Sequence, residues 1–187
     1  RLLMVGAGAM VPYLIEAHCT VHPTLERIRI WNRSPGRRDA LIKTLRTEQQ
    51  VDPADDLAEA VAWADIICCA TMTTEPLING AWLGEGVHLD LVGAFRADMR
   101  EADDEALRRG RLFVDSRDTT IGEIGELVIP INAGVISRED VIADLYELCA
   151  GYPARTSPTE ITIFKNGGGG HLDLMTARYI QERCTSR

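Results

Sequence analysis

The chain has 187 residues and a formal net charge of −8, so it can bury a full core in one domain, or in one domain and a fragment of another. The negative charge, with acids dispersed along the chain, argues against nucleic acid or an anionic membrane surface as the main partner, because both demand clustered Lys and Arg. No apolar stretch reaches the ~20 residues of a membrane span. The five cysteines form no CxxC pair, which argues against a zinc ribbon or a disulfide framework. We expect a soluble, cytoplasmic protein without a metal site.

The first residues are abrupt for a complete protein. There is no initiating Met, and Arg1 leads straight into an apolar run. We therefore expect this chain to be a segment of a longer one.

Short apolar runs alternate with segments of helical spacing along the whole chain. The apolar runs predict strands at 2–5, 28–31, 65–70, 87–91, 112–115 and 161–164. Helical spacing predicts helices at 10–18, 37–45, 57–63, 141–149 and 172–182, with a polar passage at 49–56. Apolar strands separated by helices are typical of a parallel sheet covered on both faces. The predicted fold class is α/β, a Rossmann-like doubly wound and mostly parallel sheet with helices on both faces.

The clearest chemical motif joins the first strand to the first helix. It comprises Gly6, Gly8, Ala9 and Met10 around Ala7. Gly6 permits a tight turn, Gly8 lets the backbone approach a diphosphate, and the helix N-terminus offers free N–H groups to that anion. Val11 departs from the third small residue of the G-x-G-x-x-G/A pattern. The alternative is a glycine turn that serves geometry alone.

The end of the second predicted strand bears on the choice of nucleotide. NAD-binding domains usually place Asp or Glu there, and such a carboxylate would repel a 2′-phosphate. This chain has Asn32, Arg33 and Ser34 instead, followed by Arg37 and Arg38. Arg33 can bind the phosphate of NADP, and Asn32 and Ser34 can donate to its oxygens. We therefore predict NADP(H) over NAD(H), while a solvated basic turn remains the alternative. Arg37 and Arg38 taken singly are expected to be exposed.

Three polar side chains follow later strands, at the edge where open α/β sheets bind their ligands. Thr71 and Thr73 can contact ribose or phosphate, or cap the turn before Pro76. Asp115 can contact the nicotinamide or cap the following turn. Glu123 and Glu126 are predicted to be hydrogen-bonding positions between elements and not general bases.

The chain resembles the ornithine cyclodeaminase and mu-crystallin family of NAD(P)-dependent enzymes over essentially its whole length. The order of the motifs is more specific than any one of them. The motifs that carry the resemblance are Val5-Gly6-Ala7-Gly8, Ile30-Trp31-Asn32-Arg33, Ala64-Asp65-Ile66-Ile67-Cys68-Cys69-Ala70-Thr71, Glu75-Pro76-Leu77, Gly86-Val87-His88, Val92-Gly93-Ala94-Phe95-Arg96, Val114-Asp115-Ser116, Gly122-Glu123-Ile124-Gly125-Glu126-Leu127 and Thr162-Ile163-Phe164-Lys165.

The resemblance implies a two-domain subunit, normally a homodimer, that acts on a small amino-acid or imino-acid substrate. Residues 1–165 would form the NAD(P)-binding domain, and 166–187 would be a glycine loop and a helix that lead back to a substrate and dimerisation domain. That domain, upstream of Arg1, would supply the main substrate-binding Arg and Lys. The loop with Lys165, Asn166 and Gly167 would lie against the nicotinamide.

A departure from the cyclodeaminase pattern bears on the reaction. Where those enzymes carry an Asp after the Val-Gly pair, this chain has Phe95, and an aromatic ring cannot accept a proton. The segment is more similar to reductase-like members that act on imines of 2-oxo acids, and Phe95 would form part of the pocket wall. The reaction expected is therefore NADPH-dependent reduction of a cyclic or alkyl ketimine. An ornithine cyclodeaminase with bound NAD and a non-catalytic, crystallin-like binder remain alternatives.

Overall fold

The computed structural model describes residues 1–185, which form an eight-stranded sheet in which every strand pairs in parallel with its neighbours. The strand order is β3-β2-β1-β4-β5-β8-β6-β7. The strands are β1 (Leu2–Val5), β2 (Arg27–Trp31), β3 (Gln50–Pro53), β4 (Ile66–Cys69), β5 (His88–Leu91), β6 (Gly110–Val114), β7 (Val141–Asp144) and β8 (Ile161–Lys165). The predicted α/β fold class is confirmed.

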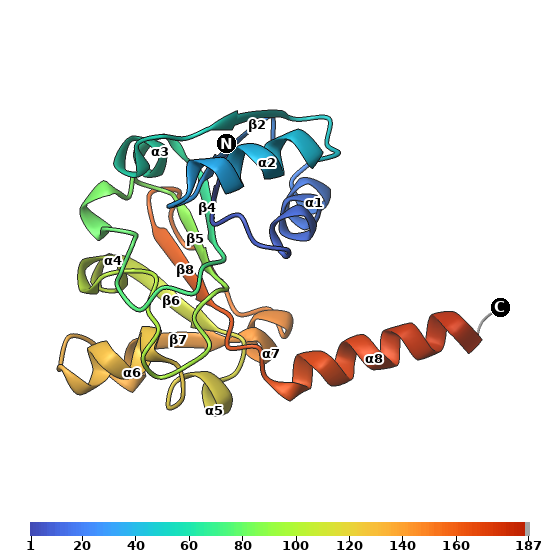
Figure 1. Ribbon diagram of the computed structural model, residues 1–187. Coiled ribbons are helices and arrows are strands. Elements are labelled where there is room, and N and C mark those ends of the chain that lie inside the picture. Colours follow the sequence, from blue (N-terminus) through green and yellow to red (C-terminus); the bar gives the residue numbers. More distant parts are fainter. Residues whose placement is uncertain (186–187) are drawn as a thin grey trace.

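Helices connect the strands and cover both faces of the sheet (Figure 1). The α-helices are α1 (Val11–Val21), α2 (Pro35–Thr44), α3 (Leu57–Trp63), α4 (Asp104–Arg109), α5 (Arg117–Thr120), α6 (Gly125–Asn132), α7 (Leu145–Cys149) and α8 (Gly170–Thr185), and two 3-10 turns are η1 (Gly80–Trp82) and η2 (Arg138–Asp140). Asp56 caps α3, because its carboxylate accepts a hydrogen bond from the Glu59 N–H at 2.9 Å.

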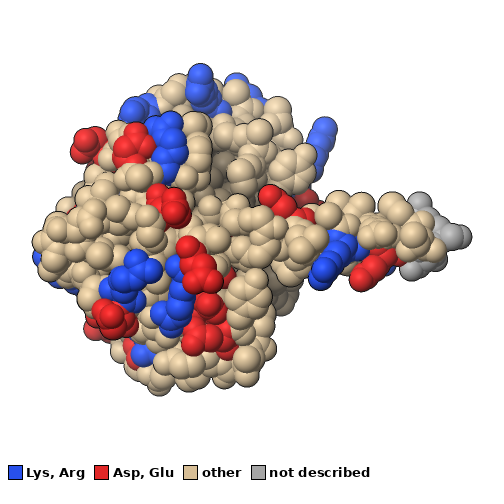
Figure 2. Space-filling view, turned by 90° about the horizontal axis from the view of Figure 1, so that it is seen from below, with Lys and Arg blue, Asp and Glu red and all other residues tan. Residues whose placement is uncertain are grey.

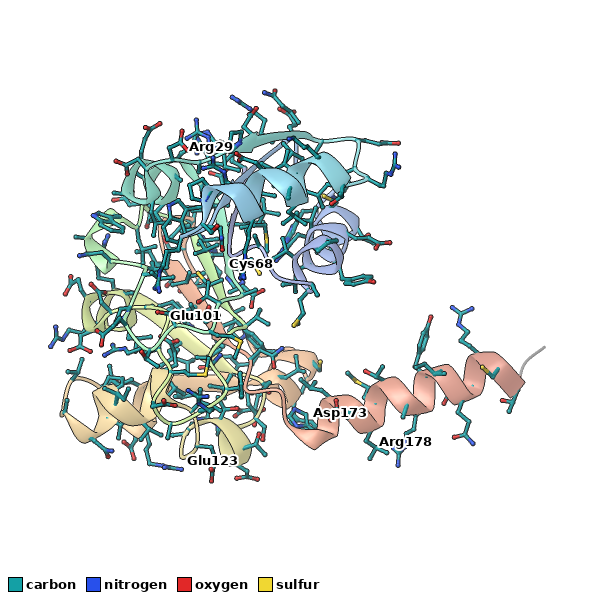
Figure 3. All side chains as sticks on the ribbon, in the orientation of Figure 1. Arg29, Cys68, Glu101, Glu123, Asp173 and Arg178 are labelled. Carbon is teal, nitrogen blue, oxygen red and sulfur yellow. The ribbon has the colours of Figure 1, made fainter. Side chains whose placement is uncertain are left out.

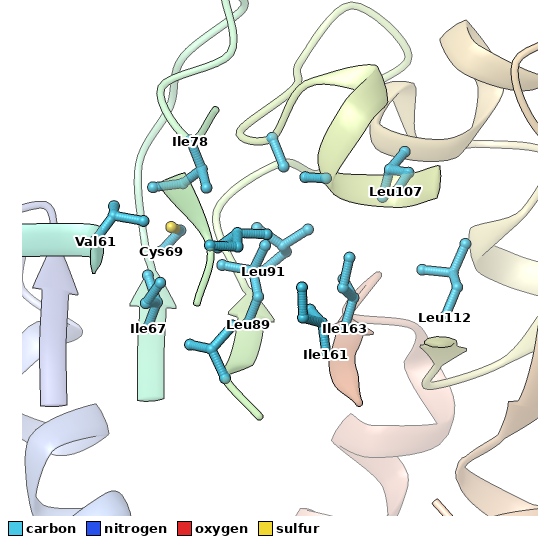
Figure 4. Packing of buried hydrophobic residues seen from close by; sticks show 14 of the residues in the cluster. Val61, Ile67, Cys69, Ile78, Leu89, Leu91, Leu107, Leu112, Ile161 and Ile163 are labelled. Carbon is cyan, nitrogen blue, oxygen red and sulfur yellow. The ribbon is translucent and has the colours of Figure 1, made fainter. Parts of the chain in front are cut away.

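Two apolar clusters fill the space between the sheet and its helices. One contains Val61 of α3, Leu107 of α4 and side chains from one face of the central strands, and its packing is drawn in Figure 4. The other lies on the opposite face, where Val11 and Ile15 of α1 pack against β1 and β2. The central strands are therefore buried on both sides, which explains their near-continuous apolar sequence.

The polar passage at 49–56 contains a strand that the sequence pattern did not predict. Gln50–Pro53 forms β3, which within the described residues 1–185 pairs only with β2 and is an edge of the sheet. An edge strand exposes much of its surface, so it needs no apolar run, and Pro is tolerated there because one side of the strand has no partner.

The predicted helix at 141–149 is wrong in its first half. Val141–Asp144 is the strand β7, and the helix α7 begins only at Leu145. A reciprocal capping box marks the boundary: Asp144 accepts from the Glu147 N–H at 3.1 Å, and Glu147 accepts from the Asp144 N–H at 2.9 Å. The Asp-Leu-Tyr-Glu spacing carries that signal, but the apolar periodicity across both elements obscured it.

The last helix, α8, projects away from the sheet (Figure 1), and none of its 16 residues is buried. Within residues 1–185, no helix is long and apolar enough to cross a membrane. On the face drawn in Figure 2, basic and acidic side chains are interspersed, and α8 carries both kinds.

Candidate dinucleotide site

The candidate site is a groove at the carboxyl edge of the sheet, where the winding of the chain reverses. From β1 the chain moves outward to β2 and β3, and it then returns to β4 on the other side of β1. Open α/β sheets bind ligands at such a reversal. The groove has a volume of about 470 Å³, and its lining comes from the loops after β1, β2 and β4: Gly6, Ala7, Gly8, Trp31, Asn32, Arg33, Ser34, Arg37, Ala70, Thr71, Met72, Thr73 and Leu77.

A second hollow, of about 520 Å³, lies between α1 and the segment that follows α2. Ala9, predicted to bind the cofactor, lines this hollow together with Tyr13 and Cys19. Although it is slightly larger, it is built from a helix side and a loop and not from strand ends. The groove at the reversal point is the better dinucleotide site, because there alone the glycine turn, a helix N-terminus and strand ends converge.

The phosphate-binding turn has the geometry that its glycines predict. Gly6 has φ +122°, and a Cβ there would lie 2.7 Å from the Ala70 carbonyl oxygen, so only glycine fits. A Cβ on Gly8 would meet nothing within 4 Å, which leaves open space in front of the turn. Among residues 1–185, the N–H groups of Ala7, Gly8 and Ala9 have no hydrogen-bond acceptor. Free amides beside open space at the start of α1 fit a diphosphate. Met10 takes the N-cap position of α1 and is exposed.

The loop after β2 brings basic and hydroxyl groups to the same groove. Arg33 and Arg37 are exposed and form no ion pair within the described part of the chain, so their guanidinium groups are available to an anion. Ser34 is the N-cap of α2 without a side-chain capping bond, which leaves its hydroxyl free. Asn32 donates to the Ser34 carbonyl at 2.9 Å and shapes the turn.

Arg38 was expected to be exposed, and this expectation is wrong. Its side chain is buried, donating to Asp55 at 2.7 Å, to Asp39 at 2.8 Å and to the Ala54 carbonyl at 2.8 Å. It therefore ties α2 to the segment after β3. Sequence neighbours on a helix point about 100° apart, so Arg37 and Arg38 have different surroundings despite their adjacency.

The loop after β4 places Thr71 and Thr73 in the groove lining, but their hydroxyls already have partners. The Thr71 hydroxyl donates to the carboxylate of Glu101 at 2.7 Å. The Thr73 hydroxyl donates to the Glu75 carbonyl at 2.7 Å and closes the turn before Pro76, as the capping alternative predicts.

The predicted residues at the ends of β6 and β8 lie outside the groove lining. Asp115 is buried and accepts from the Gly168 N–H at 3.0 Å. Burial alone would raise the pKa of Asp115, but the Thr120 hydroxyl and loop amides hold it below its ordinary value. Asn166 also accepts from the Gly168 N–H, at 2.8 Å, and Gly167 packs where a Cβ would lie 2.2 Å from the Thr120 hydroxyl. These contacts fix residues 166–168, which begin the glycine loop before α8.

Lys165 is fully buried, and its ammonium donates to the Leu91 carbonyl at 2.9 Å. Burial lowers the pKa of Lys165, although the carboxylates of Glu126 and Glu101 favour its charged form. In this position the lysine joins β8 to the end of β5.

Two buried glutamates lie beneath the loops, and sequence reasoning found only one of them. Glu126 accepts hydrogen bonds from the N–H groups of Glu101 and Ala102 at 2.7 and 2.9 Å, which confirms its predicted role between elements. Burial raises its pKa to about 7. Glu123, predicted for the same role, is exposed. Glu101 was missed because it belongs to an irregular segment in which no periodic pattern distinguishes a buried acid.

Phe95 lies on the loop after β5 and is 53% exposed. Arg96 beside it pairs with Asp98 at 2.8 Å on the surface. The guanidinium of Arg96 lies over the ring of Phe95, with its Cζ 5.9 Å from the ring centroid, and about half of the Phe95 surface stays exposed.

A further polar cluster lies on the α1 side of the sheet, away from the groove. The Cys68 thiol donates to Asp90 at 3.3 Å, and the His18 Nε2 lies 3.6 Å from the same carboxylate. Burial and the nearby Asp90 raise the pKa of the Cys68 thiol. Three elements distant in sequence supply these groups, so sequence spacing could not reveal the cluster. A protonated thiol donating to a carboxylate accounts for its arrangement.

The fold and the groove define a Rossmann-type domain whose free amides lie where this class of protein binds a dinucleotide diphosphate. The model of the Ornithine cyclodeaminase/mu-crystallin family matches residues 1–187. The chain therefore belongs to the ornithine cyclodeaminase/mu-crystallin family.

Individual relatives agree with this assignment. The chain is 51% identical to Delta(1)-pyrroline-2-carboxylate reductase of Paracoccus denitrificans over 96% of its own length and 58% of that protein. It is 33% identical to mouse ketimine reductase mu-crystallin over 99% of its length and 56% of that protein. The solved structure of Thermococcus litoralis Delta(1)-pyrroline-2-carboxylate reductase with NADH and L-proline superimposes with a TM-score of 0.92 and 29% identity, covering 99% of this chain and 58% of that one. The chain thus spans little more than half the length of these relatives.

Proposed function

We propose that this chain is the dinucleotide-binding part of an NADPH-dependent reductase that converts cyclic or alkyl ketimines of 2-oxo acids into amino acids. The observation that carries the proposal is the groove in which unbonded loop amides face open space at Gly8. The names of the reductase relatives support the class of reaction.

The bound cofactor supplies the hydride that reduces the imine carbon. The amides of the turn after β1 hold the diphosphate, and the N-terminus of α1 stabilises its charge. Arg33 binds the 2′-phosphate, with the free hydroxyl of Ser34 and the exposed Arg37 beside it. The Thermococcus litoralis relative was solved in complex with NADH, so the preference for NADPH rests on the loop after β2 alone.

Asn166 and Gly167, at the end of β8, would hold the nicotinamide end of the cofactor. Asp115 and Lys165 fix the segment that contains them. This arrangement orients the ring for transfer and helps to exclude water.

Substrate binding requires groups from outside residues 1–165. In this proposal 1–165 form the dinucleotide domain, and 166–187 lead to a separate domain that supplies the substrate-binding Arg and Lys and the contacts of a cytoplasmic homodimer. Phe95 forms one wall of the substrate pocket. Since the ring cannot exchange a proton with a substrate amine, it favours imine reduction over deamination of ornithine.

The test is an assay of the intact protein. Piperideine-2-carboxylate or pyrroline-2-carboxylate should oxidise NADPH, followed as loss of its absorbance. Release of ammonia from ornithine without net NADPH oxidation would instead identify a cyclodeaminase. Tight NADPH binding without turnover of any imine would identify a non-catalytic binder.

A further inference from the structure

The carboxylate of Glu101 joins two loops at the carboxyl edge of the sheet. Its side chain is fully buried, in the interior of the molecule (Figure 3). Oε1 accepts from the Thr71 N–H at 2.8 Å and from the Thr71 hydroxyl at 2.7 Å. Oε2 accepts from the Gly93 N–H at 2.7 Å. One side chain therefore holds the loops after β4 and β5 together.

These two loops are in direct contact around the carboxylate. A Cβ on Gly93 would lie 2.0 Å from the Thr71 carbonyl oxygen and 2.5 Å from Oε1 of Glu101. There is no room for either loop to shift toward the other, and a shift apart would break the hydrogen bonds to the carboxylate.

The backbone of Glu101 is itself fixed from two sides. Its N–H donates to Glu126 of α6 at 2.7 Å. Its carbonyl accepts from the N–H groups of Leu77 and Ile78 at 2.8 and 2.9 Å. The carboxylate is thus attached to a rigid part of the molecule.

The loop after β4 also contacts the phosphate-binding turn. The position of a Cβ on Gly6 lies 2.7 Å from the Ala70 carbonyl oxygen and 3.4 Å from Cγ2 of Thr71. Any movement of Thr71 therefore changes the floor of the groove next to the turn.

We propose that Glu101 is a positioning residue for the dinucleotide, which holds Thr71 and Gly93 in place between the phosphate-binding turn and the end of β5, where they would support the bound cofactor. This inference rests on the proposed function. Glu101 does not touch the cofactor, and it acts through the two loops that it joins.

The role requires a carboxylate and not merely a polar side chain. An ionised carboxylate only accepts hydrogen bonds, whereas an amide has one acceptor oxygen and an NH₂ group. In the variant Glu101→Gln, that NH₂ would face the N–H of Thr71 or of Gly93, and one loop would lose its anchor. A lost bond to a charged group corresponds to about tenfold to hundredfold in affinity.

The experiment compares Glu101→Gln with Glu105→Gln, which removes the same charge from an exposed position of α4. Calorimetry on the intact protein measures NADPH and adenosine 2′-monophosphate, a probe that contains the 2′-phosphate and no part of the diphosphate. Glu101→Gln should weaken NADPH by about tenfold or more and leave the monophosphate within about twofold, because the loop after β2 is untouched. Glu105→Gln should change neither.

The results distinguish a failure of the positioning role of Glu101 from a failure of the proposed function. Equal loss of both ligands in Glu101→Gln, or no loss of NADPH, would overturn the positioning role. If the unmodified protein binds no dinucleotide at all, the proposed function fails first.

Hydrogen exchange on the unmodified protein keeps the inference testable if Glu101→Gln does not fold. Without ligand, the amides of Thr71 and Gly93 should exchange as slowly as strand amides, while those of Ala7 and Gly8 exchange fast. Fast exchange at Thr71 and Gly93 would contradict the proposal.

Discussion

The carboxyl edge of the sheet has two halves, which differ in whether their hydrogen-bond donors have acceptors within the protein. We call the loops after β1 and β2 the free half, and the loops after β4, β5 and β8 the satisfied half. The turn after β1 leaves three successive amides without acceptors within residues 1–185 and open space at Gly8. The loops after β4 and β5 bind the Glu101 carboxylate, and the loop after β8 binds Asp115. Successive amides that lack a protein acceptor and lie at an exposed helix N-terminus are open to an external anion. Satisfied donors indicate a scaffold that fixes the geometry of the site.

The largest expected effect comes from adding one methyl group in the satisfied half. Gly93→Ala places its Cβ 2.0 Å from the Thr71 carbonyl oxygen, and the loop backbones must separate. We expect a loss of about 3 kcal/mol or more in the free energy of unfolding, measured by urea denaturation. The matched control is Gly84→Ala, where a Cβ meets nothing within 4 Å, and equal stability of the two variants would contradict the close packing of the loops.

A change of similar size in the free energy of unfolding is expected when Glu126 loses its proton. Its pKa is raised from 4.5 to about 7, so between these values the folded protein keeps a proton that the unfolded chain releases. The free energy of unfolding should therefore fall as the pH rises through this window, by up to about 3 kcal/mol, and should show no further contribution from Glu126 above it. Urea titrations from pH 4.5 to 8 measure this slope. In Glu126→Gln, which cannot titrate, the slope should be shallower whatever its absolute stability.

In the free half, the largest effect is expected at the loop after β2. Arg33→Ala should weaken NADPH by about tenfold to hundredfold, the cost of a hydrogen bond between charged groups, while NADH loses far less. Calorimetry with both nucleotides measures the ratio. Arg108→Ala, which removes an exposed arginine on α4, serves as the control. Equal losses for NADPH and NADH would mean that Arg33 does not bind the 2′-phosphate.

The smallest expected effect sharpens the comparison with Gly93. The Cβ that Gly8→Ala adds would meet nothing within 4 Å. The free energy of unfolding should therefore stay within about 0.5 kcal/mol of that of the unmodified protein. The new methyl group occupies the space that the diphosphate needs, so NADPH affinity should fall about tenfold. Thermal denaturation and calorimetry on the same sample test both parts. An unchanged affinity would place the diphosphate elsewhere.

Sequence reasoning predicted the free half of this edge better than the satisfied half. The glycine turn and Arg33 follow strands with clear apolar patterns, so their place at the carboxyl edge could be derived from strand order alone. Glu101 and Arg38 could not be placed in the same way, since burial of a charged side chain depends on partners distant in sequence. The segment 141–149 contains the strand β7 and the helix α7. It was predicted as one helix because the apolar spacing continues across the two elements.

The polar edge strand β3 has a consequence for the behaviour of the protein in concentrated solution. Within residues 1–185 it pairs with β2 alone, its Pro53 lacks an N–H group, and Asp52 carries a charge paired with Arg27 at 3.1 Å. Such a strand is a poor template for a strand from another molecule. The same lack of apolar pattern that concealed this strand in the sequence thus protects that margin of the sheet from intermolecular aggregation.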